Sequence, residues 1–267
     1  MLRLILHIRM VHRAGKLTLS LVQALGDFAI FTGLAFQSAL GSRKLGRRVV
    51  RAMFEQGVRC LPVILIVGMF TGLVLGLQGY YVLNRFGSES LLGTLVSLSI
   101  VRELGPVLAA LMLVGQAGSA LAAELGIQRN TEQIAALDTM GVSSHAYLVT
   151  PRLIAALLVF PMQTALFCCV GLWGGSVSGS LLLGLEPGIY WSAVERSVAM
   201  PDVRECMMKA VTFGLLTISL CAYHGFNAHR SKAGSGARAV SASTTRAVVQ
   251  SSIIVLAADY VITSFLI

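Results

Sequence analysis

Charged residues are scarce in this chain of 267 residues: they make up 12% of the sequence, whereas soluble domains carry about a quarter. Hydrophobic residues reach 55%, and the mean hydropathy is +0.78. This balance excludes a soluble globular protein and predicts a single all-α membrane domain over residues 1–267. The formal net charge of +9 does not indicate a nucleic-acid partner, because the basic residues lie beside apolar segments, as cytoplasmic flanks do.

The motifs of common enzymes are missing as well. The sequence contains no GxxxxGK[ST] motif, since Gly15 and Lys16 are followed by Leu17, so ATP binding through a P-loop is excluded. It also contains no HExxH, no GxSxG and no metal-ligand cluster. The five cysteines form no CxxC pair and lie mostly in apolar runs. We therefore expect a chain that is not an enzyme and that holds no metal ion or cofactor of its own.

Five apolar stretches are long enough to cross a bilayer, which requires about 20 residues. The predicted spans are 60–83, 91–123, 148–185, 206–226 and 247–267. Lys and Arg concentrate before the first span and before the last, so the positive-inside rule predicts a cytoplasmic N-terminus and a C-terminus on the opposite side. An odd number of spans argues against an inverted repeat, and symmetry would have to come from a homodimer.

Residues 1–45 are predicted to form an interfacial region instead of a span. Lys16, Ser20, Gln23 and Asp27 recur at spacings of four, three and four, which places them on one helical face. A helix with one polar face lies along the membrane surface more readily than it crosses. A true span over 17–40 remains the alternative, because basic residues flank it on both sides.

Glycine recurs every fourth residue in two of the predicted spans. Such faces allow two helix backbones to approach closely in lipid. The pattern fits packing within the chain and also fits a contact between two copies. The glycines concerned are Gly68, Gly72 and Gly76 in the first span and Gly171, Gly175 and Gly179 in the third.

Arg102 and Glu103 lie in the second predicted span. Adjacent helical residues point about 100° apart, so the two side chains cannot neutralise each other. They could face a polar cavity, reach the outer interface, or hold neighbouring helices together. Pro106 follows closely and permits a kink. Asp259, in the last span, suggests a structural hydrogen bond more strongly than a proton relay.

The polar segment 124–144 separates the second and third spans. Acidic side chains alternate there with apolar ones, which predicts a short amphipathic helix on the cytoplasmic side. Thr131 is a candidate for its N-cap. The segment could be a solvated turn, but its acidic face on a basic chain suggests a docking element for a soluble partner.

Several ordered motifs together resemble one family. These are RELGP at 102–106, GQAGSA at 115–120, AELG at 123–126, TEQI at 131–134, and the closing STTRAVVQSSIIVLAADYVITSFLI. The chain is similar to MlaE-type permeases, also called the YrbE family, from about residue 55 onward. GLVLGLQG at 72–79 resembles the family's first-span motif.

The resemblance implies the permease subunit of an ABC transporter in the inner membrane of a Gram-negative bacterium. Such a permease forms a homodimer and associates with cytoplasmic ATPase subunits, which bind ATP and Mg, with a STAS-domain subunit, and with a periplasmic MCE-domain hexamer. It moves glycerophospholipid between inner and outer membranes and so maintains outer-membrane lipid asymmetry. An uncoupled secondary transporter or channel, or a scaffold for the periplasmic ring, are the alternatives.

The resemblance also implies roles for individual residues. The segment 124–141 would be a coupling helix that docks on the ATPase. Two positions depart from the family pattern: Gln116 stands where the family usually has Arg, and the loop 230–242 lacks the usual acidic residues and proline. The implied substrate-binding residues are Arg102, Glu103 and Lys209 near an outward-facing cavity and Leu75, Gln78, Val82 and Leu83 at its wall and mouth; the implied coupling residues are Glu124, Thr131, Glu132, Asp138 and Gly141.

Overall fold

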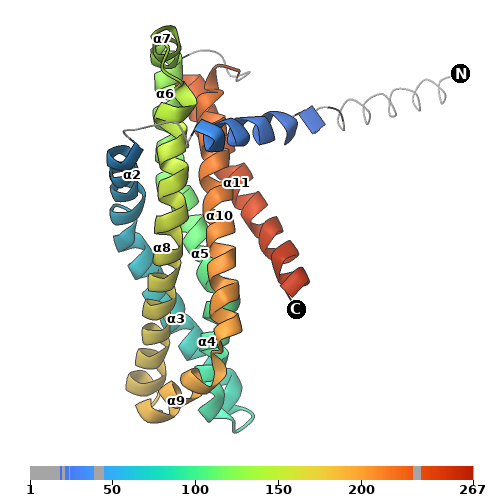
Figure 1. The fold of residues 1–267 in the computed structure, drawn as a ribbon. Helices are drawn as coiled ribbons and strands as arrows, with labels where there is room; N and C mark the ends of the chain where they lie inside the picture. The colour runs from blue at the N-terminus through green and yellow to red at the C-terminus, as the bar shows by residue number, and fades with distance from the viewer. Residues whose placement is uncertain (1–18, 20–21, 24, 39–44, 231–235, 267) are drawn as a thin grey trace, which may run out of the picture.

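The computed structural model describes residues 19, 22–23, 25–38, 45–230 and 236–266, and this part of the chain is helical without any strand. Five helical segments are long and apolar enough to cross a membrane, which confirms the predicted all-α membrane protein with five spans. They pack into an elongated bundle (Figure 1). The segments are Leu45–Asn84, Glu89–Asn130, His145–Leu182, Met200–Phe226 and Ala237–Leu266.

Most of these segments extend beyond the predicted spans, because hydropathy marks only the apolar part of a helix whose backbone hydrogen bonds continue into polar sequence. Short π-helical turns join α-helices within single segments. The α-helices are α2 (Leu45–Met53), α3 (Leu61–Asn84), α4 (Leu92–Ser99), α5 (Gly105–Leu113), α6 (Ser119–Asn130), α7 (Gln133–Thr139), α8 (Thr150–Ser176), α9 (Pro187–Ser197), α10 (Met200–Phe226) and α11 (Ala237–Leu266). We call the two ends of the bundle the α7 end and the α9 end (Figure 1).

Helices α3 and α8 pack against each other through their glycine faces. A Cβ atom on Gly76 would lie 2.9 Å from the carbonyl oxygen of Gly175, and one on Gly72 would overlap the carbonyl oxygen of Gly171. A Cβ on Gly68 would lie 3.1 Å from the carbonyl oxygen of Phe167. The glycine repeat of the first span therefore makes its contact within the chain, which was one of the two alternatives left by the sequence.

The third-span glycines also receive side chains from the α9 end. A Cβ on Gly175 would lie 2.6 Å from the Tyr190 hydroxyl, and one on Gly179 would lie 2.8 Å from a methyl group of Leu92. Tyr190 is buried and donates a hydrogen bond of 3.0 Å to the Leu172 carbonyl. Burial raises the pKa of the Tyr190 phenol, which keeps it a donor. These contacts hold α9 against the end of the bundle.

Helix α8 contains two prolines and is nevertheless continuous from Thr150 to Ser176. Pro151 lies in its first turn, where a missing N–H costs little, since that group would have no partner in the helix. Pro161 lies inside the helix, which continues past it to Ser176. Packing against α3 and α10 along its length supports this continuity.

The described part of the N-terminal region contains the helix Leu25–Gln37, which is shorter than the roughly 20 residues of a span. It runs across the bundle near the α7 end (Figure 1). Phe31 and Ala35 are buried, and the Phe31 ring contacts Tyr223 and His145 at centroid distances of 5.6 and 5.2 Å. Lys16 and Ser20 lie outside the described residues, and the interfacial location stays a prediction.

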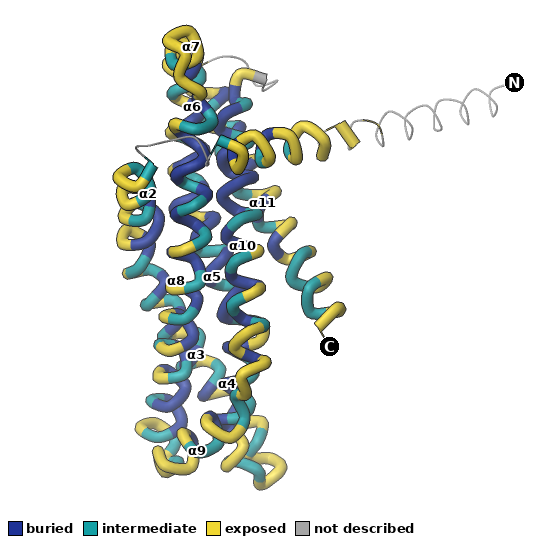
Figure 2. The backbone as a smooth tube through the Cα atoms, in the orientation of Figure 1, coloured by how far each residue is buried: buried dark blue, intermediate teal, exposed yellow. Residues whose placement is uncertain are grey.

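Helix α11 is the least buried of the five spans. Only 11% of its most apolar window is buried, against 61% for α10. Its outer half leans away from the bundle and is largely exposed (Figure 2). Its buried residues recur every fourth position and are small except for the last; they are Ala239, Ser243, Ala247, Ser251 and Val255.

Candidate functional site

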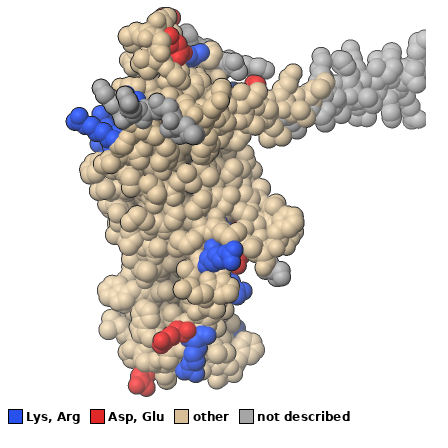
Figure 3. All heavy atoms as spheres, viewed as in Figure 1, with Lys and Arg blue, Asp and Glu red and all other residues tan. Residues whose placement is uncertain are grey.

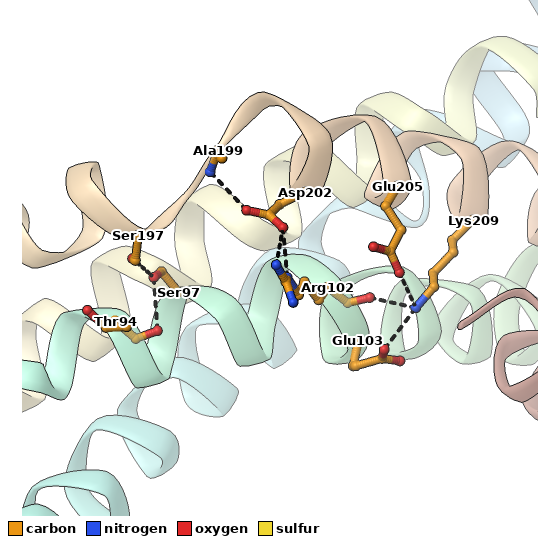
Figure 4. A network of polar contacts seen from close by, with 9 residues as sticks. All are labelled: Thr94, Ser97, Arg102, Glu103, Ser197, Ala199, Asp202, Glu205 and Lys209. Atoms are coloured by element: carbon orange, nitrogen blue, oxygen red, sulfur yellow. Dashed lines mark hydrogen bonds and ion pairs between the residues drawn. The ribbon is translucent and has the colours of Figure 1, made fainter. Parts of the chain in front are cut away.

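A π-helical turn at Ile100–Leu104 separates α4 from α5 and carries the two charged residues of the second span. Pro106 follows in the first turn of α5 and has no N–H to donate. The carbonyl oxygen four residues earlier, on Arg102, therefore lacks its usual α-helical donor. The Lys209 ammonium donates to that oxygen at 2.8 Å instead (Figure 4). The proline thus leaves a carbonyl oxygen inside the bundle without its helical donor, and Lys209 of α10 donates a hydrogen bond to that oxygen.

Lys209 is completely buried and lies among three carboxylates. Its Nζ is 3.0 Å from Glu103, 3.3 Å from Glu205 and 3.3 Å from Asp259. These partners come from the second, fourth and fifth spans, so the group ties three helices together; Figure 4 shows it without Asp259. We call Lys209 and its three carboxylates the Lys209 cluster. A buried ammonium requires such compensation, because an unpaired charge inside a protein is costly.

Arg102 makes a separate ion pair beside this cluster. Its Nε and Nη2 atoms each lie 2.7 Å from Oδ1 of the buried Asp202. The second oxygen of Asp202 accepts the backbone N–H of Ala199 at 2.9 Å and so caps the start of α10 (Figure 4). The Arg102 side chain remains 49% exposed, whereas Lys209 is 0% exposed. Arg102 is therefore the cation of this site that a ligand can reach.

The two neighbours Arg102 and Glu103 do not pair with each other, as the sequence predicted. Each binds a different residue of α10, and Glu103 also accepts a hydrogen bond of 3.2 Å from Thr263 of α11. The site has two cations and four carboxylates, so both cations are compensated within the chain. Of the three readings left open by the sequence, the contacts show helices held together.

Asp202 and Glu205 were not among the predicted site residues, because both precede the predicted span 206–226. The α-helix α10 begins at Met200, six residues before the predicted span, because Pro201 lies in its first turn and Asp202 caps it. The spacing of Glu205 and Lys209 is i,i+4, a usual distance for an ion pair on one helix face, and it was the available signal.

The residues implied at the apolar wall and mouth of a cavity lie on different sides of α3. Leu75 and Leu83 pack against the buried cluster formed with Leu92 and Val96. Gln78 and Val82 are exposed. Only the second pair therefore lies on the surface that could face a lipid or another subunit.

The implied coupling residues lie at the α7 end. Glu124 belongs to the long helix α6, which continues to Asn130, and it pairs with Arg152 of α8 at 2.6 Å. The prediction that Thr131 caps the short helix is wrong, since Thr131 donates to the Ile127 carbonyl at 2.9 Å and so closes α6. Glu132 is the N-cap of α7 and adopts a left-handed φ of 57°. The short helix thus begins at Gln133, after a reversal at Glu132.

Helix α7 is anchored by Ile134 and by the partly buried Leu137, and its other residues are exposed. Ile134 is buried, whereas Met140 is 68% exposed (Figure 2). Asp138 accepts the backbone N–H of Ser144 at 3.3 Å, and Gly141 adopts a φ of 73° in the turn between them. The turn therefore depends on one aspartate and one glycine, and it presents α7 at the tip of the molecule. Among the described residues, no group of three or more His, Cys, Asp or Glu could hold a metal ion.

These features define a multi-pass membrane protein whose spans are joined by buried charges and that presents a short helix at one end. The family model described as Permease MlaE matches residues 49–265. The chain is 37% identical to the intermembrane phospholipid transport system permease protein MlaE of Haemophilus influenzae, over 97% of this chain and 98% of the relative. The chain belongs to the MlaE permease family, a family of transport permease subunits, which confirms the resemblance.

Two other relatives are named as probable ABC transporter permeases. A probable ABC transporter permease protein of Rickettsia bellii is 37% identical over 93% of this chain and 94% of its own length. A probable ABC transporter permease protein of Synechocystis is 34% identical over 94% of each. The similarity therefore covers almost the whole chain, including the α7 end and the Lys209 cluster.

Proposed function

We propose that this protein is the permease subunit of an ABC transporter that moves glycerophospholipid between the inner and outer membranes and so maintains outer-membrane lipid asymmetry. The observation that supports this most is the end-to-end similarity to the Haemophilus influenzae permease, whose name specifies intermembrane phospholipid transport. The protein would reside in the inner membrane of a Gram-negative bacterium. Its periplasmic and cytoplasmic partners would be an MCE-domain hexamer, a STAS-domain subunit and ATPase subunits.

The α7 end is proposed to be cytoplasmic and to receive the motor. Arginines gather over α2 at this end (Figure 3), as the positive-inside rule requires of a cytoplasmic flank. The chain has no P-loop, so ATP and Mg would bind to a separate ATPase. The exposed helix α7 would dock on that subunit and transmit its movement into α6.

A homodimer is proposed to form the lipid cavity. The exposed faces of α3 and α11 would line it, with Gln78 and Val82 on its wall. The Lys209 cluster would keep the outer parts of three helices in register, because its lysine is fully buried and paired. Contact with a lipid phosphate would fall to Arg102, because its side chain is half exposed and its guanidinium has N–H donors beyond those on the Nε and Nη2 atoms that face Asp202.

Lipid transfer between proteoliposomes tests this function. The protein reconstituted with its ATPase should transfer phospholipid in an ATP-dependent way, and Arg102→Gln should slow transfer about tenfold, since one charge-assisted hydrogen bond is lost. Arg196→Gln is the control, because Arg196 is exposed on α9 and its hydrogen bonds among the described residues go to Ser192 of the same helix. Transfer that proceeds without ATP would indicate a secondary transporter or channel, and no transfer with any partner would indicate a scaffold; either contradicts the proposal.

A second prediction concerns the docking of α7. Gly141→Val should weaken the turn that ends α7, because a left-handed backbone costs a β-branched residue about 1–2 kcal/mol. We expect less ATPase subunit to co-purify with this variant. Gly87→Val is its control, since Gly87 also has a positive φ, 62°, and lies in the loop at the α9 end. Equal recovery of the ATPase with both variants would argue against docking through α7.

A further inference from the structure

A polar groove lies between α2 and the facing parts of α6 and α8, toward the α7 end of the bundle. It consists of two adjoining cavities of about 470 and 310 Å³. Both are lined by Arg51, Glu55, Glu124 and Arg152. We call the two cavities together the arginine groove. It shares no residue with the Lys209 cluster, and one of its lining residues, Glu124, is also an implied coupling residue.

The waist of the groove is electrically neutral. Arg51 pairs with Glu55 at 3.0 Å, and Arg152 pairs with Glu124 at 2.6 Å. These four side chains neutralise one another and leave little charge for a ligand. Any attraction for an ion must therefore come from the ends of the groove.

Each end contributes an arginine that forms no ion pair with a carboxylate in the described part of the chain. Arg59 lines the larger cavity, of about 470 Å³, and has no carboxylate within 4.0 Å in the described part of the chain. Arg48 lines the smaller cavity, of about 310 Å³, and its guanidinium stacks on the Tyr147 ring, 3.8 Å from the ring centroid. Two positive charges thus remain available in the groove. An arginine guanidinium in this state suits a phosphate, which it binds through paired N–H donors.

The walls of the groove also carry unused acceptors. Gln56 is only 5% exposed, donates to the Arg152 carbonyl at 3.2 Å, and leaves its Oε1 atom without a partner among the described residues. The Oε1 atoms of Gln116 in the larger cavity and of Gln128 in the smaller one also have no hydrogen-bond partner among the described residues. Buried amide oxygens without a donor are costly and rare in folded proteins. The Gln56 and Gln116 side chains line the larger cavity, so rotation of each amide would turn its oxygen toward a ligand that donates hydrogen bonds.

The third feature is an apolar wall. Beside its polar groups, the larger cavity is lined by Cys60, Ala117, Ala120 and Leu121. The apolar run of α3 begins at Leu61, directly after Cys60. The larger cavity therefore lies where the polar end of the bundle meets its apolar part. A ligand for this place combines an anion, a hydrogen-bond donor and an apolar portion. A glycerophospholipid with an ethanolamine or glycerol headgroup has all three.

We propose that the arginine groove binds a glycerophospholipid from the leaflet at the α7 end. Its phosphate lies against Arg59, and its headgroup donates hydrogen bonds to Gln56 and Gln116. Ethanolamine and glycerol headgroups carry such donors, whereas the trimethylammonium of choline carries none. The groove therefore selects phosphatidylethanolamine and phosphatidylglycerol over phosphatidylcholine. The inference does not rest on transport, because the site shares no residue with the Lys209 cluster.

Photocrosslinking tests this binding in the purified complex, without ATP. The probe is phosphatidylethanolamine that carries a diazirine near its headgroup, and mass spectrometry maps the crosslinked peptides. We expect crosslinks within residues 51–60 and 116–124. Excess phosphatidylethanolamine or phosphatidylglycerol should remove them, whereas phosphatidylcholine and inorganic phosphate should not.

Variants separate the site from general lipid contact. Arg59→Gln should lower the crosslink yield in these peptides about tenfold, because a charge-assisted contact to phosphate is lost. Arg85→Gln is the matched control, since Arg85 is an exposed arginine after α3 at the other end. An unchanged yield in Arg59→Gln, equal competition by phosphatidylcholine, or displacement by inorganic phosphate alone would each overturn the proposal. None of these outcomes depends on whether lipid is transported.

Discussion

Replacing Gly72 with alanine should prevent α3 and α8 from packing. The new Cβ atom would overlap the carbonyl oxygen of Gly171, which belongs to the backbone and cannot rotate away. The two helices would have to separate, and both neighbouring glycine contacts would be lost with them. Forced overpacking of this kind costs about 3 kcal/mol or more. We expect a strong loss of monodisperse protein in detergent, measured by size-exclusion chromatography, and a lower thermal unfolding temperature.

Gly115→Ala is the control for this experiment. Gly115 lies in the second span, and a Cβ atom there would meet no described atom within 4 Å. The two variants thus make the same chemical change in the same apolar environment, and only one meets a backbone. Similar unfolding temperatures for Gly72→Ala and Gly115→Ala would show that the close approach of α3 and α8 does not stabilise the fold.

The second large effect is expected for Lys209→Met. Removing the ammonium leaves Glu103, Glu205 and Asp259 without their common cation and leaves the Arg102 carbonyl without its donor. Loss of one partner from a buried ion pair costs about 3–5 kcal/mol, because the remaining charge is uncompensated. The unfolding temperature in detergent should fall well below that of the wild type.

A triple variant tests the reason for that loss. Lys209→Met combined with Glu103→Gln and Asp259→Asn removes two of the stranded charges, so part of the stability should return. Arg196→Met controls for loss of a cation on the exposed helix α9. A single Lys209→Met variant as stable as the wild type would refute the helix-tying role of the cluster, whatever its effect on lipid transfer.

The five spans were predictable because hydropathy over about 20 residues reflects the bilayer directly. The residues that meet inside the bundle were not. Asp202 lies 100 residues from Arg102, and Thr263 lies 160 residues from Glu103, so their pairing depends on how three helices pack. Hydropathy indicates which segments cross the membrane, but it does not indicate which helices pack against each other.

The α7 end shows a different limit. The polar segment after residue 123 predicted a break in the helix, but α6 continues to Asn130, because a helix can leave the membrane intact when its side chains meet polar partners. Glu124 has such a partner in Arg152, 28 residues away in the next span. The reversal at Glu132 also lacks a glycine signal, since a non-glycine residue adopts the left-handed conformation there.

The small-residue stripe of α11 has a consequence for the shape of the molecule. Side chains repeated every fourth residue form a ridge inclined to the helix axis, and packing on such ridges favours a steep crossing, whereas a repeat of 3.5 residues favours nearly parallel helices. The stripe ends at Val255, and beyond it the helix keeps contact with the bundle through the side chains of Asp259 and Thr263. The spacing of its alanines and serines therefore favours the tilt of α11 relative to the bundle. A leucine heptad in place of that spacing would bring α11 closer to parallel with α10 and would shift Asp259 relative to Lys209.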